Sequence, residues 1–196
     1  MADISIEQIK KLKELSGVGL TDAKKALVEA DGDFDKALDA MRKKGLTKAE
    51  KRGDRETREG LIDAYIHDGR LGAIVEVNCE TSFVAKTDEF KTLAHQIAMQ
   101  VASMNPLYVS EDDIPAEVRK AKMKELEENF KGPANMKEQI LSGQVKKAFS
   151  DKVLMNQPYI LDDTKTVEQF VKEAIAKTGE NITIRQFKRI ELGVTE

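Results

Sequence analysis

The sequence predicts an α+β protein, with an N-terminal module of three helices, a charged linker, and a core in which a small antiparallel sheet packs on helices. Three observations lead to this prediction. Apolar residues recur at helical spacing through residues 1–45, charged residues dominate the stretch that follows, and apolar and polar residues then alternate over residues 62–78 as in a hairpin. We therefore expect a helical module at 1–45, a linker at 46–59 and an α+β core at 60–196.

Three short helices are expected in the N-terminal module. Ser5 and Gln8 have the spacing of a capping box, and glycines interrupt the apolar pattern twice. The residues expected to start or stop these helices are Ser5, Gly17, Gly19, Thr21 or Asp22, Asp33 and, as the stop of the third helix, Gly45. A module of this length is marginal for burying a core and has no room for an active site.

The linker region carries charges of both signs. Seven basic and four acidic residues between 43 and 59 leave a net charge of +3. One interpretation is a basic tether that meets an acidic partner or RNA. The other is a solvated helical linker with ion pairs between residues four apart, which the interleaving of the signs favours.

The core is expected to begin with the hairpin and to end with a distant strand. Asp68-Gly69-Arg70 is the expected hairpin turn, and Asn105-Pro106 is expected to end the first core helix. The expected core elements are strands at 62–67 and 71–78, helices at 86–103, 116–130, 136–142, 145–149 and 166–177, and a last strand containing Ile182, Ile184 and Phe187.

Composition excludes several classes of protein. The chain has 196 residues, 34% of them charged, with a net charge of −3, which argues against a surface that tracks nucleic acid. Aromatic residues make up 5% and Trp is absent, so a base-stacking platform is not expected. There is no apolar run of about 20 residues and no signal-peptide pattern at the start. With a single cysteine, these features predict a soluble cytoplasmic protein that binds neither membranes nor nucleic acid directly.

Candidate catalytic groups are few. Cys79 with His67 or His95 could form a thiolate and its base, and a cysteine-dependent hydrolase would lose activity on Cys79→Ser. However, Cys79 ends a predicted strand, and cysteine is among the most buried residue types. The two histidines lack metal-ligand spacing, Gly17-Val18-Gly19 lacks the rest of a dinucleotide fingerprint, and no phosphate-binding lysine loop is present. We expect no catalytic residues and no cofactor.

The junction at Val75–Val84 is the most informative segment. A strand-like alternation ends in polar residues, and Phe83 follows just before an apolar helical segment. On a rigid turn, Phe83 could face outward as a wedge whose burial in a partner is worth about 1.5–3 kcal/mol. The alternative is that Phe83 fills the protein's own core, as most phenylalanines do.

Four segments together resemble bacterial elongation factor Ts. They are GVGLTDAKKAL (17–27), VEVNCETSFVAKTDEF (75–90), MNPLYVSEDDIPAEV (104–118) and GENITIRQFKRIELG (179–193). They occur in the family's order and cover essentially the whole chain. The length resembles the short form of the family, which has one core subdomain and no C-terminal extension.

The resemblance implies guanine-nucleotide exchange on elongation factor Tu. It implies that residues 1–45 form a ubiquitin-associated-like fold contacting the partner's GTPase domain, and that a Thr-Asp-Phe-Val motif dislodges the partner's Mg²⁺. The metal belongs to the partner, so no cofactor is expected here. It also implies a homodimer. The implied contact residues are Thr81, Ser82, Phe83 and Val84 for the motif, Lys13, Val18, Gly19, Leu20 and Thr21 in the module, Met99 and Gln100 on the core helix, and Ile182, Ile184 and Phe187 at the dimer interface.

Several residues depart from the family pattern. Ser82 stands where the family usually has Asp, Leu20 and Thr21 replace two Met residues, and Gln100 replaces His. A rival class is an RNA- or ribosome-binding protein that uses residues 43–58, whose RNA affinity would fall steeply with salt.

Overall fold

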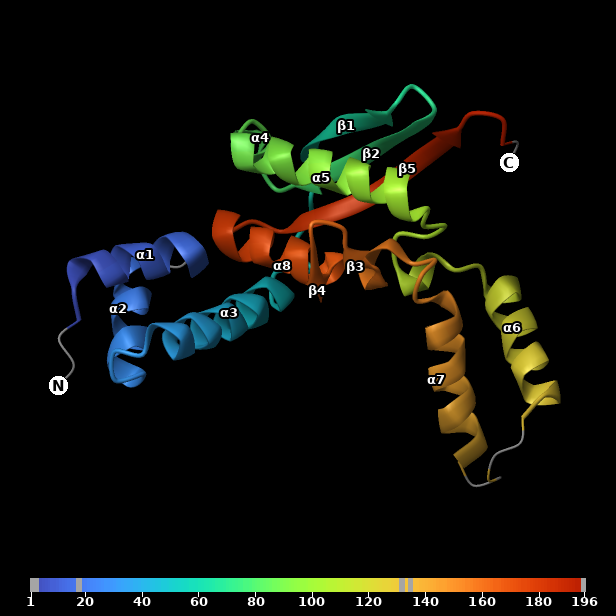
Figure 1. Cartoon of the computed structure of the whole chain (residues 1–196), viewed down its shortest axis with the longest axis horizontal. Coiled ribbons are helices and arrows are strands. Elements are labelled where there is room, and N and C mark those ends of the chain that lie inside the picture. The colour runs from blue at the N-terminus through green and yellow to red at the C-terminus, as the bar shows by residue number, and fades with distance from the viewer. Residues whose placement is uncertain (1–3, 17–18, 131–132, 134–135, 195–196) are drawn as a thin grey trace.

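The computed structural model describes residues 4–16, 19–130, 133 and 136–194, and its α+β architecture is shown in Figure 1. The N-terminal helices are α1 (Ile6–Ser16), α2 (Leu20–Glu29) and α3 (Phe34–Glu50). The predicted capping box is confirmed, because the Ser5 amide donates to Gln8 Oε1 at 2.9 Å and the Gln8 amide donates to Ser5 Oγ at 3.1 Å. Leu12, Leu27 and Met41 bring the three helices together in a small core of their own.

The predicted end of the third helix at Gly45 is wrong, because α3 continues to Glu50. Gly45 is buried where α3 crosses α8 (Val167–Thr178), and a Cβ atom at this position would lie 3.2 Å from the Cβ of Ala176. The glycine therefore permits a close approach of two helices rather than stopping one.

The caps of the second and third helices differ in their agreement with the sequence. Neither Thr21 nor Asp22 caps α2, since Gly19 is the N-cap and both residues lie in the first turn. The prediction for α3 is confirmed, because Asp33 accepts a hydrogen bond from the amide of Lys36.

The linker is fastened to the core by contacts of its charged residues with α8. Arg52 donates from Nη1 to the carbonyl of Ile175 in α8 at 3.1 Å. Lys172 of α8 reaches back to Glu50 at 3.2 Å, at the end of α3. These contacts tie both sides of the turn after α3 to the same helix.

The predicted hairpin and last strand form one three-stranded sheet. β1 (Glu59–His67) pairs antiparallel with β2 (Leu71–Cys79), and β2 pairs antiparallel with β5 (Ile182–Glu191), in the order β1-β2-β5. The helix α5 (Asp88–Met104) lies along this sheet (Figure 1). One sheet face packs with α5 and α8 around core residues that include Val75, Val77, Phe90, Ile97, Val171, Ile182 and Ile184.

The opposite face of the sheet carries exposed isoleucines. Ile62 and Ile66 of β1, Ile74 of β2 and Ile190 of β5 point away from the core and are 47–75% exposed. Ile66 and Ile190 both lie opposite Gly72, so they flank the same position of β2. We call these four residues the outer isoleucine face.

Two further helices form a hairpin that projects from the rest of the molecule (Figure 1). They are α6 (Ala116–Glu128) and α7 (Lys137–Phe149), preceded by the short 3-10 helix η1 (Glu111–Asp113). The sequence predicts two short helices at 136–142 and 145–149, but α7 is continuous because Gly143 is accommodated on an open helix face.

A small second sheet was not predicted from the sequence. It pairs β3 (Pro158–Tyr159) with β4 (Asp162–Thr166) after the 3-10 helix η3 (Leu154–Asn156). Within the residues that the structure describes, none of the helices has the length and apolar character needed to cross a membrane.

Candidate partner-binding site

Phe83 projects from a short, well-anchored helix. It lies in the first turn of α4 (Ser82–Ala85) and is 78% exposed. Its neighbours Val84 and Ala85 are buried in the core, and the Thr81 hydroxyl caps α4 by accepting from the amide of Val84. The interpretation of Phe83 as part of the protein's own core is therefore wrong.

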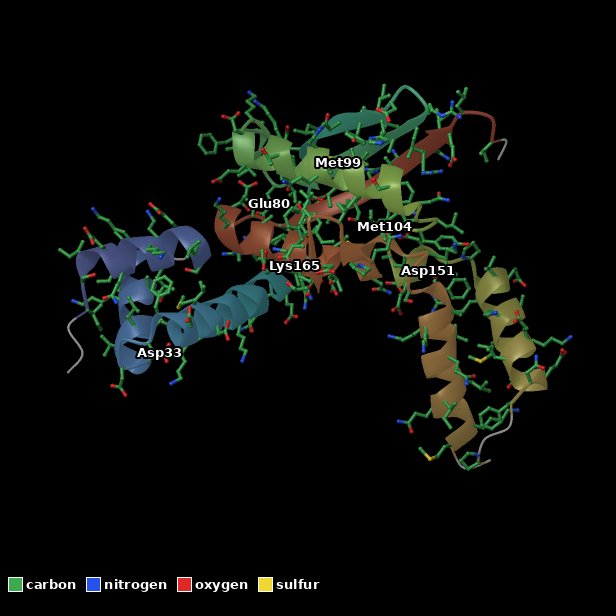
Figure 2. All side chains as sticks on the ribbon, viewed as in Figure 1. Asp33, Glu80, Met99, Met104, Asp151 and Lys165 are labelled. Atoms are coloured by element: carbon green, nitrogen blue, oxygen red, sulfur yellow. The ribbon has the colours of Figure 1, made fainter. Side chains whose placement is uncertain are left out.

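The backbone before Phe83 is held by a carboxylate from a distant segment. Glu180 accepts through Oε2 from the amides of Glu80 and Thr81, at 3.1 and 3.0 Å. Its Oε1 accepts from the Thr81 hydroxyl at 2.5 Å. In return, the Glu80 carboxylate accepts from the amide of Asn181 at 2.6 Å, and Figure 2 shows Glu80 close to α8.

Cys79 lies beneath this segment and is not available for chemistry. It is fully buried, and its thiol donates to the carbonyl of Thr81 at 3.2 Å. Burial raises the pKa of the Cys79 thiol, and the negative charge of Glu180 raises it further. His95 bonds to Asp63 and His67 to the Tyr65 hydroxyl, so both imidazoles have partners of their own. Burial beside a carboxylate favours the neutral form of the Cys79 thiol and a structural role for it.

Met99 lies on α5 (Figure 2), is partly buried, and borders a shallow hollow. The hollow has a volume of about 420 Å³ and is lined by Met99, His95, Leu161 and neighbouring residues. Leu161 is exposed at the β3–β4 turn. Met99 is therefore placed where a partner can reach it.

Gln100 does not lie on this surface, which corrects its assignment as a contact residue. It is 0% exposed, and its Nε2 donates to Gln157 Oε1 and to the carbonyl of Pro158 at 3.1 and 3.0 Å. Its Oε1 accepts from the amide of Ile160 at 2.8 Å. The Gln100 side chain fixes the turn that carries Leu161, and because it is buried it offers no surface for a partner to contact.

The module residues assigned by resemblance are accessible where the structure describes them. Lys13 and Gly19 are exposed, as are Leu20 and Thr21, and Leu20 is half exposed despite being apolar. Val18 lies outside the described residues. The exposure of these residues leaves them accessible to a partner.

The last-strand residues assigned to a dimer interface are not surface residues. Ile182 and Ile184 are buried in the protein's own core, and Phe187 packs partly against it. The large apolar side chain that β5 turns outward is Ile190.

Sequence reasoning missed two parts of this surface. The first is Glu180, which lies within the GENITI segment but was not assigned a role; a carboxylate directly after a helix-ending glycine is the available signal. The second is the turn with Ile160 and Leu161, for which adjacent apolar residues after Gln157-Pro158 are the only indication.

The chain matches known proteins over nearly its whole length. A family model described as "Elongation factor TS" matches residues 46–194. The protein named elongation factor Ts of Thermotoga maritima is 50% identical over 193 residues, covering 97% of each chain. The proteins of the same name from Thermoanaerobacter sp. strain X514 and Fervidobacterium nodosum are 47% and 43% identical, each over 97% of this chain.

Proposed function

The chain belongs to the elongation factor Ts family, and from this premise we propose that it is a guanine-nucleotide exchange factor for elongation factor Tu during translation in the cytoplasm. The observation that carries the proposal is the exposed Phe83 on a turn anchored from both sides. It acts by binding and contributes no catalytic group of its own.

The proposed mechanism uses Phe83 as a wedge. Thr81, Ser82 and Phe83 form the segment that approaches the partner's nucleotide site, whereas Val84 is buried and anchors this segment to the core. The Phe83 ring enters between partner helices and displaces the Mg²⁺ that the partner holds. Exchange is then a reciprocal coupling, in which the factor and the nucleotide weaken each other's binding by the same amount.

One side chain cannot supply the whole effect. Each tenfold weakening of nucleotide binding requires about 1.4 kcal/mol of differential binding. A buried Phe provides about 1.5–3 kcal/mol, or one to two factors of ten. The remainder comes from a broad contact in which the N-terminal module grips the GTPase domain at Leu20 and α5 grips it at Met99.

The proposed function is tested by release of labelled GDP from elongation factor Tu with and without the protein. Accelerated release that scales with the concentration of the protein is the expected result. Release at the spontaneous rate, with a partner shown to bind GDP normally, would exclude the function.

Ser82→Asp is expected to leave exchange equal to that of the wild type or faster. Ser82 is exposed at the first position of α4, whose first turn carries no acidic residue, and a negative charge near a helix start is favourable. The rate of GDP release at a fixed concentration of the factor measures this. A clear loss would mean that the Ser82 hydroxyl makes a contact of its own with the partner, while Ser82→Ala serves as the uncharged control.

We also propose a homodimer formed through the outer isoleucine face. Four exposed isoleucines lie on one sheet face, which also carries Glu76, Gln186 and Lys188, and a second copy can cover this face by two-fold symmetry. This replaces the interface of buried residues expected from the sequence.

Ile66→Lys is expected to turn the dimer into a monomer, because the substitution replaces an apolar contact with a charge that the interface would have to bury. Light scattering should give twice the chain mass of 21.9 kDa for the wild type, and the mass of one chain for the variant. Val28→Lys, which changes an exposed residue of α2 away from the sheet, is the matched control. A monomeric wild type at micromolar concentration would contradict the dimer.

A further inference from the structure

Three distant segments meet directly behind Phe83. The end of β2 contributes Glu80 and Thr81, the turn between α8 and β5 contributes Glu180 and Asn181, and the linker contributes its backbone. Asn181 is 2% exposed, and its Nδ2 donates to the carbonyls of Gly53 and Arg55 at 3.2 and 2.7 Å. We call Glu180 and Asn181 the brace.

Both the carboxylate and the backbone amide of Glu180 are hydrogen-bonded. The Glu180 carboxylate takes two backbone amides and one hydroxyl from the segment before Phe83. The Thr178 hydroxyl accepts from the Glu180 amide at 3.4 Å, and Gly179 ends α8 in a left-handed conformation with φ of 80°. The carboxylate is thus carried by a helix end, and hydrogen bonds that backbone amides donate to a carboxylate are stronger than those between neutral groups.

The position of these bonds relative to Phe83 is informative. They fix the two residues immediately before α4, whereas the Phe83 side chain itself is almost free of contacts with the rest of the chain. A wedge that meets its partner in one orientation loses less freedom on binding when its support is already ordered. If only a fraction of molecules held that orientation, the apparent affinity would be the intrinsic affinity multiplied by that fraction.

We propose that Glu180 is a positioning residue, which holds the Thr81–Phe83 backbone in the conformation that meets elongation factor Tu. The inference rests on the proposed function. It assigns to the GENITI segment a role in partner binding that is exerted through Phe83 and requires no direct contact between Glu180 and the partner.

The test compares Glu180→Ala with Glu180→Gln in the GDP-release assay. Glu180→Ala removes all three bonds, and we expect the concentration for half-maximal stimulation to rise about tenfold, which corresponds to about 1.4 kcal/mol. Glu180→Gln should restore the wild-type value within about twofold, because the amide oxygen can accept from both backbone amides and the NH₂ group can donate to the Thr81 hydroxyl.

Asp113→Ala is the matched control. The Asp113 carboxylate also accepts from a backbone amide and a hydroxyl, both of Ser110, but at η1 and far along the chain from Phe83. Removal of the Asp113 carboxylate should leave the concentration for half-maximal stimulation unchanged. Thermal melts of all variants establish that the compared proteins are folded.

The decisive measurement repeats Glu180→Ala in a Phe83→Ala background. If Glu180 acts through Phe83, the second substitution adds nothing to the loss caused by the first. A further tenfold loss in this background would overturn the inference, because Glu180 would then act independently of Phe83. An unchanged response of Glu180→Ala alone would overturn it as well.

Failure of the inference is distinguishable from failure of the proposed function. If the wild type does not accelerate GDP release, or if Phe83→Ala exchanges normally, the proposed function or its wedge is wrong. If Phe83→Ala is impaired and Glu180→Ala is not, only the positioning role is wrong. Should Glu180→Ala not fold, Thr81→Val removes one bond of the brace together with the bond by which the Thr81 hydroxyl caps α4. It should raise the concentration for half-maximal stimulation by at least about threefold, which is half of the tenfold step in free energy. A wild-type value for Thr81→Val would then overturn the inference.

Discussion

Replacement of Phe83 by alanine is expected to slow stimulated GDP release by about 10- to 100-fold, because the lost burial of the ring is worth about 1.5–3 kcal/mol. The ring is 78% exposed in the free protein, so its removal opens no cavity and should not change the melting temperature. Stopped-flow release of labelled GDP at several concentrations of the factor measures the first effect, and a thermal melt measures the second.

A matched substitution separates the wedge from general surface effects. Leu107 is 58% exposed in the segment after α5, and Leu107→Ala should leave both exchange and melting unchanged. Loss of a cooperative melt in Phe83→Ala would contradict our interpretation, since it would mean that the ring stabilises the folded chain. Normal exchange by a folded Phe83→Ala protein would exclude the wedge mechanism.

Replacement of Gln100 by methionine is expected to reduce stability and to leave exchange intact at temperatures where the protein is folded. The substitution keeps the size of the side chain but removes its three hydrogen bonds, and it leaves the buried Gln157 Oε1 without this donor. An unpaired buried polar group costs about 1–3 kcal/mol, so a loss of about 2–3 kcal/mol in the free energy of unfolding is expected. The melting temperature should fall by about 5–10 °C.

Gln96→Met is the control for this experiment. Gln96 lies one turn earlier on α5 and is only partly buried, so its replacement should change the melting temperature little. If Gln100→Met instead melted normally and lost exchange, the side chain would have to contact the partner, in contradiction to its burial. The comparison thus decides between the structural role seen here and the contact role implied by resemblance.

The sequence predicted local features well and the meeting of distant segments poorly. The hairpin and the Ser5–Gln8 capping box depend on residues that are close in the chain, and both were found as expected. Gly45 was interpreted as a helix stop because its neighbour Ala176 is 131 positions away and cannot be identified from a local pattern. Gln100 was assigned to the partner contact by resemblance to the family motif, and its burial could not be identified because its partner Gln157 is remote in sequence.

The candidate site divides along the same line. Phe83 was identified from the family motif, but periodicity left its direction open, and only the packing of Val84 and Ala85 turns it outward. The last strand was predicted, but its outward side was not. The pairing of β2 with β5 shifts between Glu76 and Val77. Because of this irregularity, strict alternation along β5 does not predict which side chains face the core at both ends of the strand.

Because α3 is one continuous helix, the number of residues between its contact with the N-terminal module and its contact with α8 affects how the two parts of the molecule are oriented. The 17 residues of α3 form a rod about 25 Å long at 1.5 Å per residue, with Phe34 packed in the module and Gly45 against α8. Each residue of such a rod turns the next by about 100°. One residue added between Met41 and Gly45 would therefore rotate the N-terminal module, and Leu20 with it, by about 100° around the axis of the rod relative to the core. The length of α3 therefore sets the orientation of the N-terminal module relative to the core, and with it the directions from which the two parts can contact one partner.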